Sequence, residues 1–159
     1  RAGCEEVRRG GVTELMRLRE PKLHKTEGDG MGDLGDLGKD LIRRRVNEAW
    51  NSYDLGVVDQ CIHEGLVARD IARDPYQPNF PGRQGATDFV NGIHAAFAGL
   101  HIEILDLISE GDKVAARLLV SGTHQGESLG VAPTRRPVAF QVGSMWRVRD
   151  GLLGYIWQD

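Results

Sequence analysis

The chain has 159 residues, 40% of them hydrophobic and 27% charged, which suits one globular domain with a core but is short for two. A net charge of −3 argues against nucleic acid or an anionic membrane as partner. The absence of a long apolar run and of a signal-peptide pattern argues against a membrane span and secretion. The two cysteines, Cys4 and Cys61, form no Cys-x-x-Cys motif, so a cytoplasmic location fits and Cys61 reads as a small buried hydrophobe.

Residues 1–37 mix charges with many glycines and differ from the rest of the chain. Such a composition does not bury enough apolar surface to order a chain. We therefore expect residues 1–37 to be a weakly ordered N-terminal extension and residues 38–159 to form the domain.

Three helical segments are expected in the first half of the domain. The first helix starts near Asp40. Its polar face is assigned to Arg43 to Arg45 and Glu48. Its apolar residues recur at helical spacing and are Leu41, Ile42, Val46, Ala49, Trp50 and Tyr53. A second helix is expected over 57–63, followed by an extended piece over 66–71. The third helix has a stripe that ends before Gly99: Ala86, Phe89, Val90, Ile93 and Phe97. Between them, the proline-rich segment 74–83 predicts a loop that acts as a lid or rim.

After Gly99 the apolar period changes to two, which indicates strands. Strands are expected over 101–108, from 114 onward, over 138–148 and over 152–159, with Asp150-Gly151 as a hairpin turn. Helices that precede an antiparallel meander predict an α+β fold, with a curved antiparallel sheet packed on about three N-terminal helices.

Two polar residues stand where chemistry is plausible. His124 shares the parity of Val114, Ala116, Leu118 and Val120, so it should face inward, either as a ligand or proton-transfer group or as a core histidine bonded to backbone. Asp159 follows Trp157 and Tyr155, whose rings would dehydrate the carboxylate and raise its pKa toward that of a base. The alternative is a solvated carboxylate.

The large apolar residues of the helix stripes also allow two interpretations. Trp50, Tyr53, Phe89 and Ile93 either fill the core or line a pocket at the mouth of the curved sheet. No metal-ligand spacing is present that predicts a metal site.

Residues 40–159 resemble the SnoaL-like polyketide cyclase family of the nuclear-transport-factor-2-like superfamily. The residues that carry the resemblance are Trp50-Asn51, Pro81-Gly82, the run from Gly122 to Arg136 that includes Thr123-His124 and Pro133-Thr134, Arg147-Val-Arg-Asp-Gly151 and Trp157-Gln-Asp159.

The resemblance implies a cone-shaped α+β barrel that works without a cofactor, as a homodimer or homotetramer, on a small apolar or aromatic polyketide-like molecule. Members of this kind close a polyketide ring by aldol condensation, using an aspartate as acid and base; related members hydroxylate, open epoxides or isomerise. The family aspartate corresponds to Gln158, with the carboxylate one residue later at Asp159, and the family histidine corresponds to Ser144 or Met145. His124 matches the turn histidine.

Two functional readings therefore stay open. In an enzyme, Asp159 is the acid/base, Gln158 and His124 orient the substrate, and the ligand-contacting residues are Trp50, Tyr53, Phe89, Ile93, Ser144, Met145 and Trp157. In the other reading the same cone is a non-catalytic binding module, or a filled structural domain.

Overall fold

The computed structural model describes residues 34–70, 81–128 and 130–158, which belong to one compact unit, Met31–Asp159. The helices are α1 (Leu34–Arg44), the π-helical segment η1 (Arg45–Asn51), α2 (Gly56–Cys61) and α3 (Gly82–Ala96). The strands are β1 (Ile62–Asp70), β2 (Phe97–Glu110), β3 (Lys113–His124), β4 (Pro137–Arg149) and β5 (Leu152–Gln158). Helix α1 begins ahead of the predicted boundary at residue 38. Of the expected extension over residues 1–37, residues 1–33 lie outside the described residues, and so do residues 74–80, which make up most of the expected lid over 74–83.

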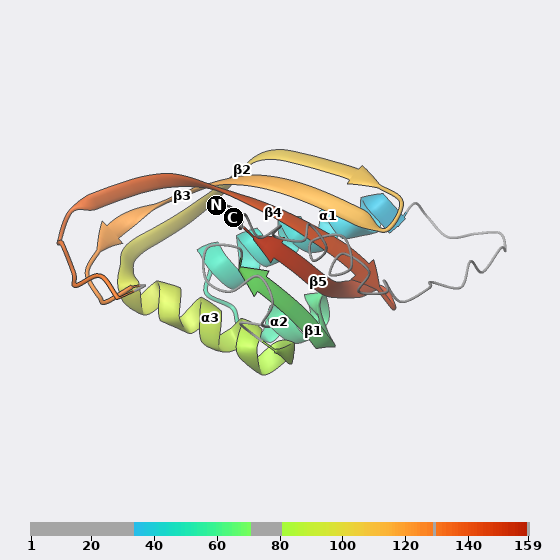
Figure 1. The fold of residues 1–159 in the computed structure, drawn as a ribbon, viewed down its shortest axis with the longest axis horizontal. Helices are drawn as coiled ribbons and strands as arrows, with labels where there is room; N and C mark the ends of the chain where they lie inside the picture. The colour runs from blue at the N-terminus through green and yellow to red at the C-terminus, as the bar shows by residue number, and fades with distance from the viewer. Residues whose placement is uncertain (1–33, 71–80, 129, 159) are drawn as a thin grey trace, which may run out of the picture. The chain divides into compact units, whose positions relative to one another are not determined.

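The five strands form one sheet in the order β1-β5-β4-β3-β2, and Figure 1 shows the long strands β2, β3 and β4 arching over the helices. The α+β class and the curved sheet are thus confirmed, and the sheet is open. One detail differs from the prediction, because the sheet is mixed: β1 pairs parallel with β5, while the other three pairings are antiparallel. Strand β1 precedes α3 in the chain and joins the sheet edge opposite β2, so the rule that successive strands form hairpins does not apply to it.

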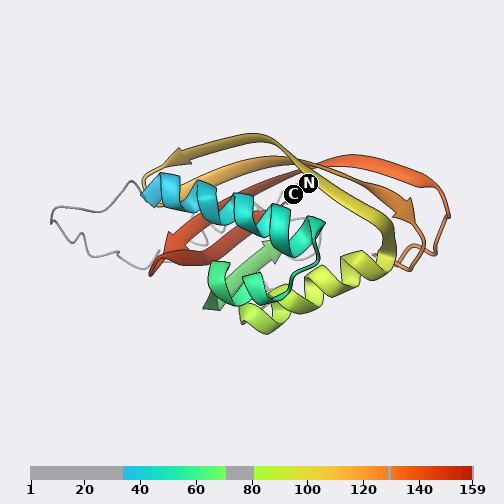
Figure 2. The same ribbon diagram turned by 180° about the vertical axis from the view of Figure 1, so that it is seen from behind.

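Alternating burial divides the sheet into two faces. Val114, Ala116, Leu118 and Val120 of β3 are buried, whereas the residues between them are exposed or half-buried. We call the face that carries them the inner face. Helix α1 packs against β2, β3, β4 and β5, and the view from behind in Figure 2 shows α1 lying beneath the sheet. The core therefore lies between the inner face and the helices.

Small and polar residues set how closely the helices approach the sheet. A Cβ on Gly38 would enter the van der Waals envelope of Val114 and Val148, so only glycine lets α1 lie this close. At the end of η1, the Asn51 amide nitrogen donates to the Ile102 carbonyl (2.9 Å), and the Ile102 N–H donates to Asn51 Oδ1 (2.8 Å). Because β2 is an edge strand, Asn51 satisfies backbone groups that no neighbouring strand reaches.

Two element ends depart from the expected positions. Helix α3 ends at Ala96, and Phe97 is the first residue of β2, so Gly99, with φ of 62°, lies inside a strand and not at a helix end. Strands β4 and β5 are joined as predicted by Asp150-Gly151, with φ of 50° and 78°, which a two-residue hairpin turn of type I′ requires. The longest described helix, α3, has 15 residues, and no helix in the described ranges has the length and apolar character of a membrane span.

Candidate functional site

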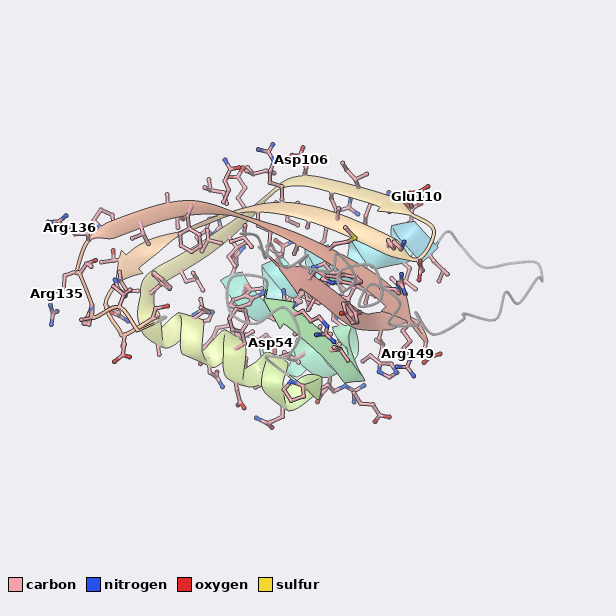
Figure 3. All side chains as sticks on the ribbon, in the orientation of Figure 1. Asp54, Asp106, Glu110, Arg135, Arg136 and Arg149 are labelled. Carbon is pink, nitrogen blue, oxygen red and sulfur yellow. The ribbon has the colours of Figure 1, made fainter. Side chains whose placement is uncertain are left out.

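Polar side chains are rare in the interior. Among the described residues, the buried polar or charged side chains are those of Arg45, His124 and Ser144. No described carboxylate is buried, and Figure 3 shows Asp54, Asp106 and Glu110 at the surface. A buried polar group in an apolar core needs a partner to offset its lost hydration. The three residues are therefore where a ligand site is most plausible.

Arg45 is the least expected of them. Its side chain is 8% exposed, and its guanidinium carbon lies 5.1 Å from the centre of the Trp50 ring and 4.7 Å from that of Trp146. Burial lowers the pKa of Arg45 to about 10, and the nearby Cys61 counteracts this only in part. The charge is thus held between two aromatic faces in a dehydrated place.

The π-helical turn brings Arg45 and Trp50 together. In an α-helix, residues five apart are rotated by roughly 140° around the axis. In a turn that bonds residue i to i+5, residues five apart lie roughly above one another. The π-helix of η1, Arg45–Asn51, therefore lets the guanidinium stack on the ring five positions later.

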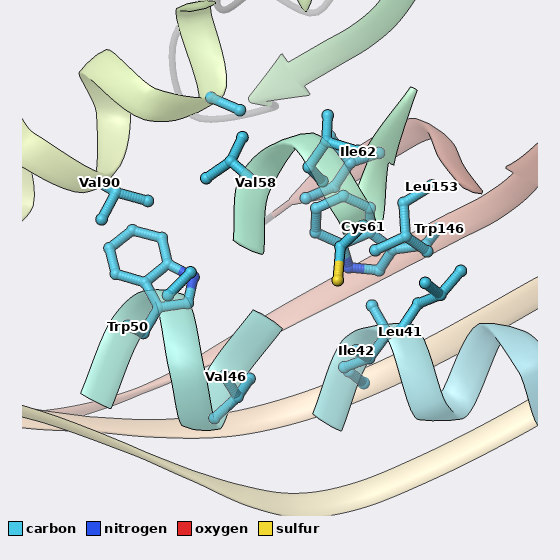
Figure 4. Packing of buried hydrophobic residues seen from close by; sticks show 14 of the residues in the cluster. Leu41, Ile42, Val46, Trp50, Val58, Cys61, Ile62, Val90, Trp146 and Leu153 are labelled. Atoms are coloured by element: carbon cyan, nitrogen blue, oxygen red, sulfur yellow. The ribbon is translucent and has the colours of Figure 1, made fainter. Parts of the chain in front are cut away.

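The residues of the inner face beside Arg45 come from β4 and from the end of α2. The Trp146 indole N–H donates to Ser144 Oγ (3.0 Å), and both side chains are buried on the inner face. Figure 4 shows Cys61 beside Trp146, with Trp50 on the other side of the cluster. The Cys61 thiol is buried as expected, and desolvation raises its pKa, so it stays protonated.

The strand register aligns Ser144 with residues of β5 and of the edge strand β1. Ser144 is the partner of Gln158, and Gln158 is the partner of Asp70 on β1. Directly opposite residues of paired strands share one face. For Gln158 and Asp70 the structure describes only the backbone, and Asp159 lies outside the described residues.

The residues predicted to line a pocket from the helices lie largely together. Trp50 contacts Phe89 edge to face (5.7 Å between ring centres) and stacks on His94 (6.3 Å). The Tyr53 ring lies 4.2 Å from His94, but Tyr53 is 48% exposed, and its hydroxyl donates to Asn91 Oδ1 (2.7 Å). Phe89 and Ile93 are half-buried against the core. Trp50, Phe89 and His94 therefore form a cluster. Trp50 and Phe89 were predicted from the sequence, whereas His94 was not. The Nε2 atom of His94 lies 2.9 Å from the Trp50 carbonyl oxygen.

His124 is buried with the predicted parity but stands apart from this site. Ser144 pairs with Ala116, and eight residues of β3 between Ala116 and His124 span about 26 Å at roughly 3.3 Å per residue. Its Nδ1 accepts the Thr134 N–H (3.3 Å) and lies 3.2 Å from Thr134 Oγ1, while its Nε2 has no partner among the described residues. His124 thus holds the loop that leads to β4, where Arg135 and Arg136 are exposed (Figure 3).

Two predicted ligand-contacting residues lie on the other face of the sheet. Met145 pairs with Trp157, one residue out of phase with buried Ser144 and Trp146, and is 45% exposed. Trp157 is half-buried and packs on Tyr155 (4.0 Å between ring centres). The structure therefore does not bring Met145 and Trp157 together with Trp50 and Ser144.

Arg45 was not predicted as a site residue, because its charge favoured a place on the polar face of the helix. Arg45 lies four residues after Leu41 and four before Ala49, so the helical period itself places it on the apolar face, contrary to the assignment of Arg43 to Arg45 to the polar face. The described residues contain no group of three His, Cys, Asp or Glu side chains arranged to hold a metal ion.

Comparison with known proteins gives consistent matches. A model of the SnoaL-like polyketide cyclase family matches residues 40–158. IdmH of Streptomyces antibioticus, described as a candidate polyketide cyclase, is 33% identical over 77% of this chain and 90% of that chain, with a TM-score of 0.62. AclR of Streptomyces galilaeus, described as a candidate hydroxylase, is 29% identical over 77% of each chain, with a TM-score of 0.62. A candidate SnoaL-like polyketide cyclase from Jannaschia sp. CCS1 is 18% identical over 83% of this chain and 90% of that chain, with a TM-score of 0.71, which shows the fold. A search of curated proteins finds no match.

Proposed function

Because the chain belongs to the SnoaL-like polyketide cyclase family, we propose that it is a cofactor-independent enzyme that uses acid–base chemistry on a small apolar or aromatic polyketide-like molecule. The observation that carries this proposal is the buried polar group of Arg45 and Ser144 on the inner side of an otherwise apolar core. Aromatic rings flank that group, which suits a planar ligand that carries oxygen atoms.

The leading reaction is an intramolecular aldol-type ring closure. A base removes a proton next to one carbonyl, the resulting enolate carbon attacks a second carbonyl of the same molecule, and the new alkoxide takes up a proton. Holding the two ends of one substrate together supplies several kcal/mol of such a barrier, and a dry site strengthens the base. Hydroxylation, epoxide opening and isomerisation are the related alternatives.

We propose a carboxylate at the end of β5 or β1 as the base. Asp159 is the residue that the sequence favours, and Gln158 next to it is an orienting group. Asp70 is a second candidate, because its backbone is in register with Gln158, which in turn pairs with Ser144. His124 is about 26 Å along the strand from this point, so we assign it to holding the loop before β4 and not to the chemistry.

Proton abstraction is testable before the natural substrate is known. The probe is 2-acetylanthraquinone in D₂O, whose methyl protons lie next to a carbonyl, with deuterium uptake followed by mass spectrometry. We expect the protein to accelerate the exchange, and Asp159→Asn or Asp70→Asn to abolish the acceleration, whereas Asp54→Asn, a change at an exposed carboxylate, leaves it intact. Acceleration that survives in both Asp159→Asn and Asp70→Asn contradicts the assignment of the base.

The second candidate is a non-catalytic binding module of the same apolar ligands. It is favoured by Gln158 and Ser144, which stand where the family resemblance implies an aspartate and a histidine. Saturable binding of 2-acetylanthraquinone without accelerated exchange would support the binding module over the enzyme. A homodimer or homotetramer and a cytoplasmic location are further proposals from the same resemblance, and light scattering of the purified protein tests the first.

A further inference from the structure

We propose that the Arg45 guanidinium binds an anionic oxygen of the ligand, so that the substrates of this site are planar acidic molecules that carry a carboxylate or an ionised 1,3-dicarbonyl group. This inference deepens the proposed function and rests on it for the apolar, aromatic part of the ligand. The site consists of Arg45 with the rings of Trp50 and Trp146, and of Ser144 beside them.

The first step is that Arg45 is charged and has no counter-ion among the described residues. An arginine carries five N–H donors and no acceptor. In the described part of the chain, the Arg45 guanidinium makes neither a hydrogen bond nor an ion pair, although its neighbour Arg44 pairs with Glu48 (3.2 Å) and Gln60 (2.8 Å). Buried charges in proteins are otherwise paired.

The second step is that the aromatic rings leave the donors available. Trp50 and Trp146 contact the guanidinium through their rings, at 5.1 Å and 4.7 Å. Such contacts attract the charge, but they satisfy none of the in-plane N–H groups. The Trp146 indole N–H is already used by Ser144 Oγ, so it does not compete for the same ligand atom.

The third step identifies the ligand chemistry. A guanidinium is a flat fork that matches the two oxygens of a carboxylate, and the two oxygens of a 1,3-dicarbonyl enolate offer a similar planar pair. The flanking rings and the apolar core favour a ligand with a flat ring system. Both features together select an acidic aromatic molecule over a neutral or a purely polar one.

The experiment compares two probes of nearly the same shape, the anionic anthraquinone-2-carboxylate and the neutral anthraquinone-2-carboxamide, by isothermal titration calorimetry at neutral pH. The variants are Arg45→Met, which is unbranched, of comparable volume and uncharged, Arg45→Lys, which keeps charge without the fork, and Arg44→Met as the matched control. We expect the native protein to prefer the carboxylate by about ten- to a hundredfold, the factor of charge-assisted hydrogen bonds. The preference should vanish in Arg45→Met, fall in Arg45→Lys and persist in Arg44→Met.

A second arm separates the two oxyanions. The probe is benzoylacetone, a 1,3-diketone whose enolate has its own ultraviolet absorption. Binding to the native protein should lower the pH at which the enolate forms, and binding to Arg45→Met should not. A carboxylate preference without this change would restrict the ligand class to carboxylates.

Sodium formate tests the anion site without any aromatic ligand. At equal ionic strength, formate should raise the melting temperature of the native protein more than chloride does, and this difference should be lost in Arg45→Met. Equal binding of carboxylate and carboxamide, with no effect of formate, overturns the inference and points to a counter-ion from within the chain, while the proposed function stands. Binding of neither anthraquinone, with a formate effect that depends on Arg45, supports the anion site and removes the aromatic ligand of the proposed function. If neither anthraquinone nor formate has any effect, both proposals fail.

Discussion

Replacing Arg45 with methionine should make the ligand-free protein more stable, which is an unusual expectation for a buried residue. The lowering of its pKa from the ordinary arginine value to about 10 corresponds to about 3 kcal/mol by which burial disfavours the charged form. Methionine has a comparable volume and no charge, so it retains most of the apolar packing near Trp50 and Trp146 without that cost. Replacement of buried charges by apolar side chains of similar volume is often neutral or stabilising.

The lost ring contacts offset part of this gain. Two cation–π contacts contribute roughly 0.5–2 kcal/mol each, depending on burial, and the methionine sulfur recovers about 0.3–1.5 kcal/mol against an aromatic ring. We therefore expect Arg45→Met to raise the free energy of unfolding by about 1–2 kcal/mol. For a chain of this size that equals a rise of roughly 2–8 °C in melting temperature.

The pH dependence of stability also tests whether Arg45→Met stabilises the protein. The folded-state pKa of Arg45 lies below the unfolded value, so the unfolded state holds the proton more tightly between about pH 10 and the ordinary pKa of arginine. The cost of the charge is fully present below pH 10 and disappears only as the pH rises through that window. The advantage of Arg45→Met should hence be constant across neutral pH.

Urea unfolding followed by circular dichroism measures the effect, with Arg44→Met as control. The Arg44–Glu48 pair is half-exposed, so its loss should leave the free energy of unfolding nearly unchanged. A lower free energy of unfolding in Arg45→Met than in the native protein would refute the reasoning, because removing one partner of a buried ion pair costs about 3–5 kcal/mol.

Three further substitutions test the framework of the site. Gly38→Ala should destabilise the protein by about 1–3 kcal/mol, because the new Cβ collides with Val114 and Val148. The control Gly92→Ala, in open space on α3, should stabilise the protein by up to about 1 kcal/mol. Thermal unfolding of the two variants measures the difference. Asn51→Ala should cost about 2–4 kcal/mol in urea unfolding, since both backbone groups of Ile102 lose their partner, and a cost no greater than that of exposed Asn47→Ala would contradict this. Gly151→Ala should lower the melting temperature, by an amount equal to about 1–2 kcal/mol, because its φ of 78° is unfavourable for alanine; the same change at Gly143, which has a free environment, should not.

The strands were predictable because their signals are local. The alternation of Val114, Ala116, Leu118 and Val120 requires only that one side of β3 be buried, and the inward parity of His124 follows from it. Asp150-Gly151 supplies the positive φ angles that its turn needs. Neither signal depends on which distant strand lies alongside.

The candidate site was only partly predictable because it depends on distant pairings. The alignment of Ser144 with Gln158 and of Gln158 with Asp70 arises from the register of three strands, one of which is reached through the parallel pairing of β1. A turn sequence fixes the register of neighbouring hairpin strands, but no local signal fixes the register of β1 against β5. For the same reason, the separation of His124 and Gln158 along the sheet could not be predicted from local signals.

The placement of Arg45 shows how local and non-local signals combine. The helical period from Leu41 to Ala49 is enough to bury it, but α-helical geometry alone would rotate Trp50 away from it by roughly 140°. The extra residue of the π-helical turn brings the ring back onto the guanidinium, and Trp146 closes the other side from a strand about a hundred residues later in the chain. π-Helical turns are found frequently at functional sites. The departure from α-helical geometry in η1 therefore coincides with the one buried cation of the described core, and this is the reason to test Arg45 before any of the residues that the family resemblance suggested.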